Sequence, residues 1–114
     1  MKELITIVET KQYQTKSLKI LSMNNQKAIV DYLAQHPKTG KIMQGTGGIR
    51  KLRWGKDGKG KSGGIRIIYY FYNEKIPLFL LTFFAKNEKD NLSKMERNEL
   101  KKLTILLKQQ YGEV

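Results

Sequence analysis

The chain has 114 residues, the length of one ordinary domain, so we expect a single domain over residues 1–114. Its 22 Lys and Arg residues against 10 Asp and Glu give a net charge of +12, which attracts nucleic acid, an anionic membrane surface or an acidic protein. The sequence has no cysteine, which excludes thiolate metal sites and cysteine nucleophiles. With no apolar run near the ~18 residues of a membrane span, we expect a cytoplasmic protein without a membrane partner.

The first predicted elements are a strand and two helices. Residues 4–8 alternate loosely and are rich in β-branched side chains, which favours a short strand. Residues from about 10 to 36 have helical spacing that breaks near Ser22. Pro37 disfavours helical geometry at the residue before it, so we expect the second helix to end there.

Glycine is concentrated in the middle of the chain. Nine of the ten glycines fall between residues 40 and 64, where they flank and separate short segments. Two β-rich segments, 49–54 and 65–72, are predicted strands, and a third strand follows a turn at 78–85. Three successive strands with short connections favour an antiparallel meander.

The last element is a predicted helix that begins after Ser93. Ser93 and Glu96 have the spacing of a capping box, and apolar residues follow at helical spacing until Gly112, where a C-cap glycine would stand. The predicted order is β-α-α-β-β-β-α. We therefore expect an α+β fold with a small antiparallel sheet and the helices packed on one side.

Residues 55–62 match the Walker A pattern for phosphate binding letter for letter. That motif needs a strand before the loop and a helix after it, because the helix N-terminus holds the phosphates. Here the loop leads into an apolar strand, and no aspartate offers itself as the second nucleotide-binding partner. We interpret the segment as a hairpin loop, solvated or in contact with RNA, and we expect no cofactor.

Strand alternation predicts the face of the sheet to which each basic residue of the meander points. Lys51 and Arg53 point to one face of the first strand, Arg66 shares a face with Tyr70 on the second, and Lys86 follows the third. If the strands are adjacent, these four cations can converge on one phosphate while tyrosines stack on bases, as single-stranded RNA requires. The alternative is a solvated sheet face, although Arg66 would be costly to bury unpaired. Predicted RNA-contacting residues are Arg50, Lys56, Lys59, Lys61, Tyr70 and Lys89.

The usual parts of a nuclease are missing from the sequence. Histidine occurs once, as His36, so a two-histidine ribonuclease mechanism is impossible. No carboxylate pair has obvious metal-ligand spacing, so we expect no metal site. Catalysis would rest on cations, which suits RNA because its 2′-hydroxyl can attack the adjacent phosphate while the protein orients the chain and stabilises the phosphorane.

Three segments together resemble the RelE/HigB toxin superfamily, and its HigB-like branch in particular. They are GGIRKLRW at 47–54, GKSGGIRIIYYF at 60–71 and LTFFAKNEKDNL at 81–92. The resemblance implies a RelE-like fold and the toxin of a bacterial type II toxin–antitoxin system. It further implies a metal-independent endoribonuclease that cuts mRNA in the ribosomal A site and so inhibits translation. The implied partner is a helix-turn-helix antitoxin, through which alone the toxin would meet operator DNA.

The resemblance also assigns roles to single residues. Lys51 and Arg53 match basic strand positions that contact the scissile region and are placed for proton transfer. Arg66 matches the arginine that stabilises the transition-state phosphate. Lys86, with Lys89, falls where the family keeps further catalytic groups, but the Tyr or His that some relatives use near there is absent. The general acid and base stay open.

A non-catalytic RNA- or ribosome-binding module of the same fold would use the same basic face, and it is the alternative to an enzyme. A DNA-binding regulator ranks third, because no predicted helix combines helix-turn-helix spacing with basic base-reading residues.

Overall fold

The computed structural model describes residues 4–55, 64–89 and 91–111. In these ranges the predicted order is confirmed, with one additional two-residue strand before the meander. The strands at 49–54 and 78–85 match their predicted bounds, and the one at 65 ends two residues earlier than expected. The elements are β1 (Ile7–Glu9), α1 (Lys11–Ile20), α2 (Met23–Gln35), β2 (Lys41–Ile42), β3 (Ile49–Trp54), β4 (Ile65–Tyr70), β5 (Leu78–Ala85) and α3 (Lys94–Tyr111).

The strands form one five-stranded sheet in the order β1-β5-β4-β3-β2. The predicted antiparallel meander is confirmed for β3, β4 and β5, and β2 pairs antiparallel with β3. The sheet as a whole is mixed, because β1 runs parallel to β5. Parallel pairing needs a long connection, and the two helices and three strands between β1 and β5 supply it.

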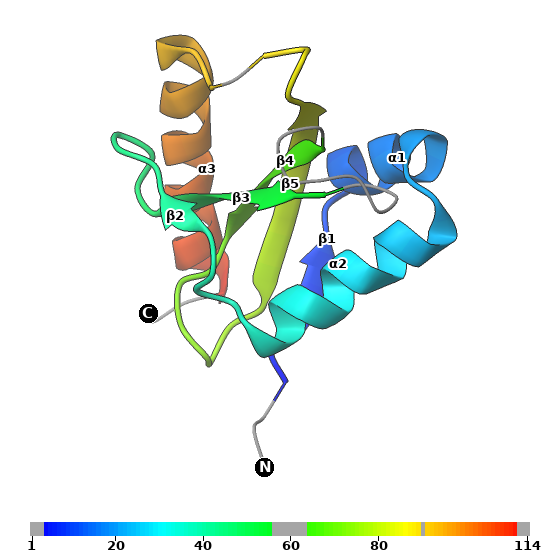
Figure 1. Cartoon of the computed structure of the whole chain (residues 1–114). Helices are drawn as coiled ribbons and strands as arrows, with labels where there is room; N and C mark the ends of the chain where they lie inside the picture. The colour runs from blue at the N-terminus through cyan, green and yellow to red at the C-terminus, as the bar shows by residue number, and fades with distance from the viewer. Residues whose placement is uncertain (1–3, 56–63, 90, 112–114) are drawn as a thin grey trace.

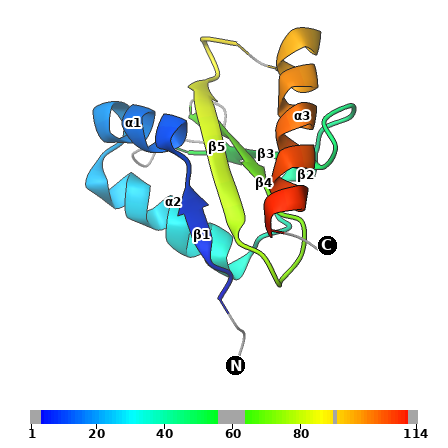
Figure 2. The same cartoon turned by 180° about the vertical axis from the view of Figure 1, so that it is seen from behind.

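The helices cover both faces of the sheet, so the prediction that they pack on one side is wrong. Helices α1 and α2 lie against one face, and α3 lies against the other (Figures 1 and 2). Two hydrophobic clusters correspond to these faces, one joining Tyr13, Ile29 and Leu33 to the sheet and one joining the sheet to Leu103 and neighbouring leucines of α3. The physical reason is that β4 is buried along its whole length and needs cover on both faces.

Capping side chains set the start of the first two helices. Thr10 precedes α1, and its hydroxyl accepts from the backbone of Tyr13 at 3.4 Å and donates to the carbonyl of Leu80 at 2.8 Å. Ser22 precedes α2 and accepts from the amide of Asn25 at 3.1 Å. The predicted helix break near Ser22 is therefore confirmed, and its cause is an N-cap.

The predicted capping box of α3 is also confirmed. The amide of Ser93 donates to Glu96 Oε1 at 2.8 Å, and the amide of Glu96 donates to Ser93 Oγ at 3.1 Å. Lys89 forms an ion pair with the other carboxylate oxygen of Glu96. These contacts tie the segment after β5 to the first turn of α3. The predicted C-cap, Gly112, lies outside the described residues.

We predict that Glu96→Gln weakens the fold at neutral pH and not in acid. The hydrogen bond from Lys89, and then that from the Ser93 backbone, hold the pKa of Glu96 below its ordinary value of 4.5. The stabilisation from a lowered carboxyl pKa is present above the unfolded pKa and disappears as pH falls through the folded one. Because the pair is partly exposed, the loss should stay under about 1 kcal/mol.

Thermal unfolding of the parent and Glu96→Gln at about pH 7 and about pH 3 measures this effect. An equal difference in stability at both pH values would contradict it. Glu99→Gln is the matched control, since Glu99 carries the same charge on the same helix in an exposed pair with Lys102 at 3.7 Å.

Candidate nucleic-acid interface

The side chains of β3 alternate between the two faces of the sheet, as predicted. Leu52 and Trp54 pack toward the cluster under α1 and α2. Lys51 and Arg53 therefore point to the opposite face, where Lys51 is opposite Ile68 and Arg53 is opposite Arg66 in the β3–β4 register. Side chains of directly opposed residues lie on the same face of a sheet. The structure thus brings Arg53 and Arg66 together as cross-strand neighbours.

The four predicted catalytic cations differ in accessibility. Arg53 and Lys86 are exposed and Lys51 is partly buried, whereas Arg66 is only 2% exposed. Arg66 is engaged within the protein and lies between Arg53 on β3 and Phe84 on β5. In this conformation RNA can reach three of the four cations directly. Contact with Arg66 requires neighbouring atoms to move.

At this site one end each of β3, β4 and β5 lies close to the others, because their backbones approach one another. A Cβ added to Gly64 would lie 1.8 Å from the carbonyl oxygen of Trp54, so only glycine fits where β3 and β4 converge. The amide of Lys86 donates to the carbonyl of Gly64 at 3.3 Å. The backbone of Lys86 therefore lies beside the start of β4, at the same end of the sheet as Arg53 and Arg66.

Two of the predicted RNA-contacting residues do not fit that role in the structure. Arg50 lies on the opposite face from Lys51, and its guanidinium donates to the carbonyls of Lys38 and Gly40 at 3.1 and 2.8 Å. Tyr70 is 1% exposed and belongs to the core against α3, so no base can stack on it. The alternation prediction was right for the face of Tyr70 but could not show that α3 covers it.

The remaining predicted RNA contacts have different outcomes. Lys89 is partly buried, pairs with Glu96 and lies over the ring of Phe84, with its Nζ 5.2 Å from the ring centre. Its charge is therefore already partly neutralised. Lys56, Lys59 and Lys61 lie outside the described residues and stay predictions. The Walker A segment falls mostly there too, but the chain enters β4 at Ile65, where a phosphate-binding loop would enter a helix.

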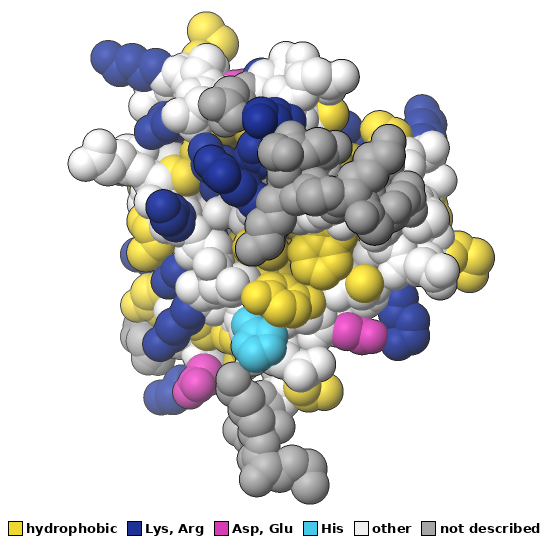
Figure 3. All heavy atoms as spheres, in the orientation of Figure 1, with side chains coloured by type: hydrophobic (Ala, Val, Ile, Leu, Met, Phe, Trp, Pro, Cys, Tyr) yellow, Lys and Arg dark blue, Asp and Glu magenta, His cyan; other side chains and the backbone are white. Residues whose placement is uncertain are grey.

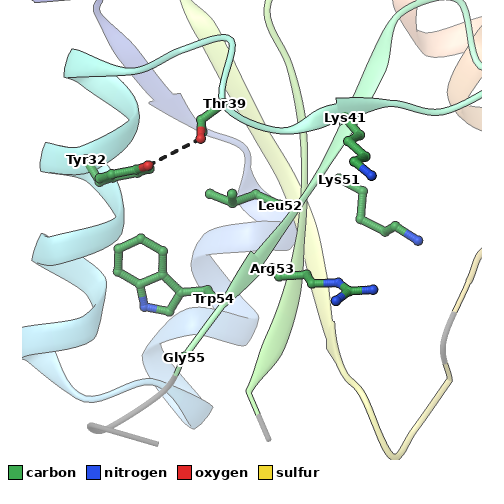
Figure 4. Close-up of a pocket in the computed structure, with 8 residues that line it drawn as sticks. All are labelled: Tyr32, Thr39, Lys41, Lys51, Leu52, Arg53, Trp54 and Gly55. Carbon is green, nitrogen blue, oxygen red and sulfur yellow. Dashed lines mark hydrogen bonds between the residues drawn. The ribbon is translucent and has the colours of Figure 1, made fainter. Parts of the chain in front are cut away.

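A groove of about 750 Å³ opens along the outer edge of β3 (Figure 4). Strand β2 pairs with β3 only at Arg50 and Lys51, so no described strand covers the edge beyond them. Both faces of β3 border the groove there. In Figure 4 the cations extend to one side of β3 and the aromatic rings lie on the other. The lining residues are Tyr32, Thr39, Lys41, Lys51, Leu52, Arg53, Trp54 and Gly55.

Buried hydrogen bonds hold the segment that leads into β2 and forms part of this groove. The hydroxyl of Tyr69 accepts from the amide of Gly40 at 2.8 Å and donates to the carbonyl of Pro37 at 2.9 Å. Burial raises the pKa of Tyr69 and so keeps its donor proton in place at neutral pH. With the two bonds from Arg50, these contacts fix the position of Thr39 and Lys41.

Sequence reasoning predicted Lys51 and Arg53 as site residues and missed the other groove residues, among them Tyr32, Lys41 and Trp54. Tyr32 comes from α2 and reaches the groove only through the packing of that helix on the sheet, which no local pattern encodes. Lys41 lies directly opposite Lys51 in the β2–β3 register, which extends the cationic row by one residue. The short stretch between Gly40 and Gly45 was the available signal, since it can hold only a short edge strand.

Among the described residues, no group of three or more His, Asp or Glu side chains is arranged to hold a metal ion. Within the same parts of the chain, none of the helices has the length and apolar character needed to cross a membrane.

A family model described as the RelE toxin of the RelE/RelB toxin–antitoxin system matches residues 5–113. The chain belongs to the RelE toxin family. It is therefore the toxin component of a toxin–antitoxin system, with an antitoxin as the expected partner, and its α+β fold agrees with the RelE-like fold. In the view of Figure 3, Lys and Arg side chains of this RelE-family toxin gather on one part of the surface.

We predict that Tyr70→Phe leaves RNA cleavage unchanged and does not destabilise the toxin. The hydroxyl of Tyr70 is buried without a hydrogen-bond partner, so its removal relieves a desolvation cost worth up to about 1 kcal/mol. Thermal unfolding and a cleavage assay on translated message test both parts. Tyr69→Phe is the control and should be destabilised, because the Tyr69 hydroxyl makes two hydrogen bonds. Reduced cleavage by Tyr70→Phe would restore Tyr70 to the RNA-contacting set.

Proposed function

We propose that this RelE-family toxin is a metal-independent endoribonuclease that cuts mRNA in the ribosomal A site and so inhibits translation in the cytoplasm. The observation that supports it best is the cross-strand pair Arg53 and Arg66, flanked by Lys51 on β3 and Lys86 at the end of β5. Cations that converge from adjacent strands can hold a single anion between them. A scissile phosphate is the anion that the family membership favours.

The proposed chemistry needs only groups that the RNA and the cations supply. The 2′-hydroxyl oxygen attacks the adjacent phosphorus, its proton passes to a base, and the bond to the 5′-oxygen breaks as that oxygen takes up a proton. The products are a 2′,3′-cyclic phosphate and a free 5′-hydroxyl. Lys51 and Arg53 would contact the scissile region and assist proton transfer, while Arg66 and Lys86 stabilise the extra negative charge of the phosphorane.

The finer family assignment belongs to the same proposal. Segments 47–54, 60–71 and 81–92 favour the HigB-like branch, whose antitoxins are similar to helix-turn-helix DNA-binding proteins. The toxin would then meet operator DNA only through the antitoxin, in a complex that represses its own operon. Sequencing the adjacent reading frames and purifying the complex test this assignment.

We predict that Arg53→Ala and Arg66→Met each reduce cleavage of translated message by about 100-fold or more, because each removes a cation that stabilises the transition state. Methionine at position 66 keeps volume in a buried site where alanine would leave a cavity. Primer extension on messages translated in vitro measures the cuts, and growth after induction without antitoxin measures toxicity. Lys75→Ala is the matched control, because exposed Lys75 lies in the turn at the other end of β4 and β5.

Circular dichroism and thermal unfolding of both variants separate loss of catalysis from loss of fold. A folded Arg53→Ala or Arg66→Met variant that arrests growth like the parent would refute the role of that arginine.

One observation favours the second candidate, a non-catalytic RNA- or ribosome-binding module. Arg66 is 2% exposed, and a cation that never touches the phosphate cannot stabilise its transition state directly. On this reading, Lys51→Ala, Arg53→Ala and Lys86→Ala weaken RNA binding by similar amounts and each lowers the salt slope of binding by about one. Uncut message in the primer-extension assay, together with this graded loss, would favour the binding module over the enzyme.

A further inference from the structure

The groove along β3 has a second wall that the proposed cleavage chemistry does not use. Tyr32 from α2 and Trp54 from β3 form this wall, with ring centres 5.6 Å apart and planes at 63°. His36 extends it, its ring 4.8 Å from that of Tyr32. Figure 3 shows hydrophobic side chains at the surface beside the one histidine.

The aromatic wall is open to solvent and held in place. Tyr32 is 38% exposed, and Trp54 is partly exposed while its other parts pack on the core. The hydroxyl of Tyr32 lies 3.2 Å from Thr39 Oγ1, in the segment fixed by Tyr69. Two large rings kept at the surface in a defined orientation form a stacking platform that binding need not order first.

The opposite wall is cationic. Lys41 and Lys51 are cross-strand neighbours, and Arg53 follows two residues later on the same face of β3. Among the eight residues that line the groove, these three are charged and none is acidic. Figure 4 shows the side chains of Lys41 on β2 and of Lys51 and Arg53 on β3 on the side away from Trp54 and Tyr32. Cations on one wall and aromatic rings on the other match a single RNA strand, whose phosphates run along the backbone while the bases project to one side of it.

We infer that Tyr32 and Trp54 form a nucleobase-binding subsite, which stacks a base of the RNA strand whose phosphates lie along Lys41, Lys51 and Arg53. The inference rests on the proposed function and names where a nucleotide next to the scissile phosphate lies. Charge favours RNA over the main alternative, a protein strand added to the open edge of β3, because three uncompensated cations line the groove. Stacking accepts every base, so the subsite would position the strand with little sequence preference.

The single tryptophan of the chain makes the inference directly measurable, because Trp54 alone emits indole fluorescence. The probe is a short 2′-O-methyl RNA oligonucleotide, which keeps bases and phosphates but lacks the hydroxyl needed for cleavage. We expect it to quench Trp54 emission on binding to the parent toxin. An abasic oligonucleotide of the same length and charge should bind more weakly and leave the emission unchanged.

Variants at Tyr32 separate stacking from packing. Tyr32→Leu keeps an apolar side chain without a ring, and we expect its affinity for the oligonucleotide to fall roughly 5- to 100-fold. Tyr32→Phe keeps the ring but loses the contact of the hydroxyl with Thr39, so its affinity should fall less than that of Tyr32→Leu. Equal affinity of Tyr32→Leu and the parent, or equal quenching by the abasic oligonucleotide, would overturn the inference.

The two proposals fail separately. If the oligonucleotide leaves Trp54 emission unchanged while the toxin still cuts message through Arg53, the subsite is refuted and the proposed function stands. If base-dependent quenching occurs but no message is cut, the subsite stands without the nuclease. Trp54 emission that responds to purified antitoxin and not to RNA would assign the groove to a protein strand and overturn the inference.

Discussion

The rest of the structure depends on the complete burial of strand β4. All six of its residues are buried, with β3 and β5 paired along its two edges and a hydrophobic cluster against each face. A polar group left without a partner in such a strand costs free energy. An arginine there is costly, and a similar apolar side chain would often be more stable. Arg66 is therefore a residue for which stability alone gives no reason.

Burial of β4 also sets the geometry of the basic face. Because β3 pairs with β4 over six residues, the register fixes Arg53 opposite Arg66 and Lys51 opposite Ile68. The outer edge of β3 is less constrained, since β2 has only two residues. The groove arises there, where a short edge strand leaves both faces of β3 accessible. The same strand thus presents cations to one side and an indole to the other.

Local patterns predicted much of this fold and part of the site. Alternation placed Lys51 and Arg53 on one face, the capping spacing located the start of α3, and flanking glycine and proline residues predicted the bounds of β3 and β5. The failures all concern contacts between distant segments. Sequence alone could not show that α3 covers Tyr70 or that Arg50 turns back to Lys38 and Gly40. Tyr32 joins the groove only after α2 packs on the sheet.

The parallel pairing of β1 with β5 has a consequence for how the toxin matures. Thr10 donates to the carbonyl of Leu80, 70 residues further along the chain, and α1 packs on β5 as well. Closing so long a loop is slow compared with forming local structure. During synthesis the apolar faces of the first two helices stay uncovered until β5 has left the ribosome. The growing chain therefore cannot complete its sheet until β5 has emerged from the ribosome.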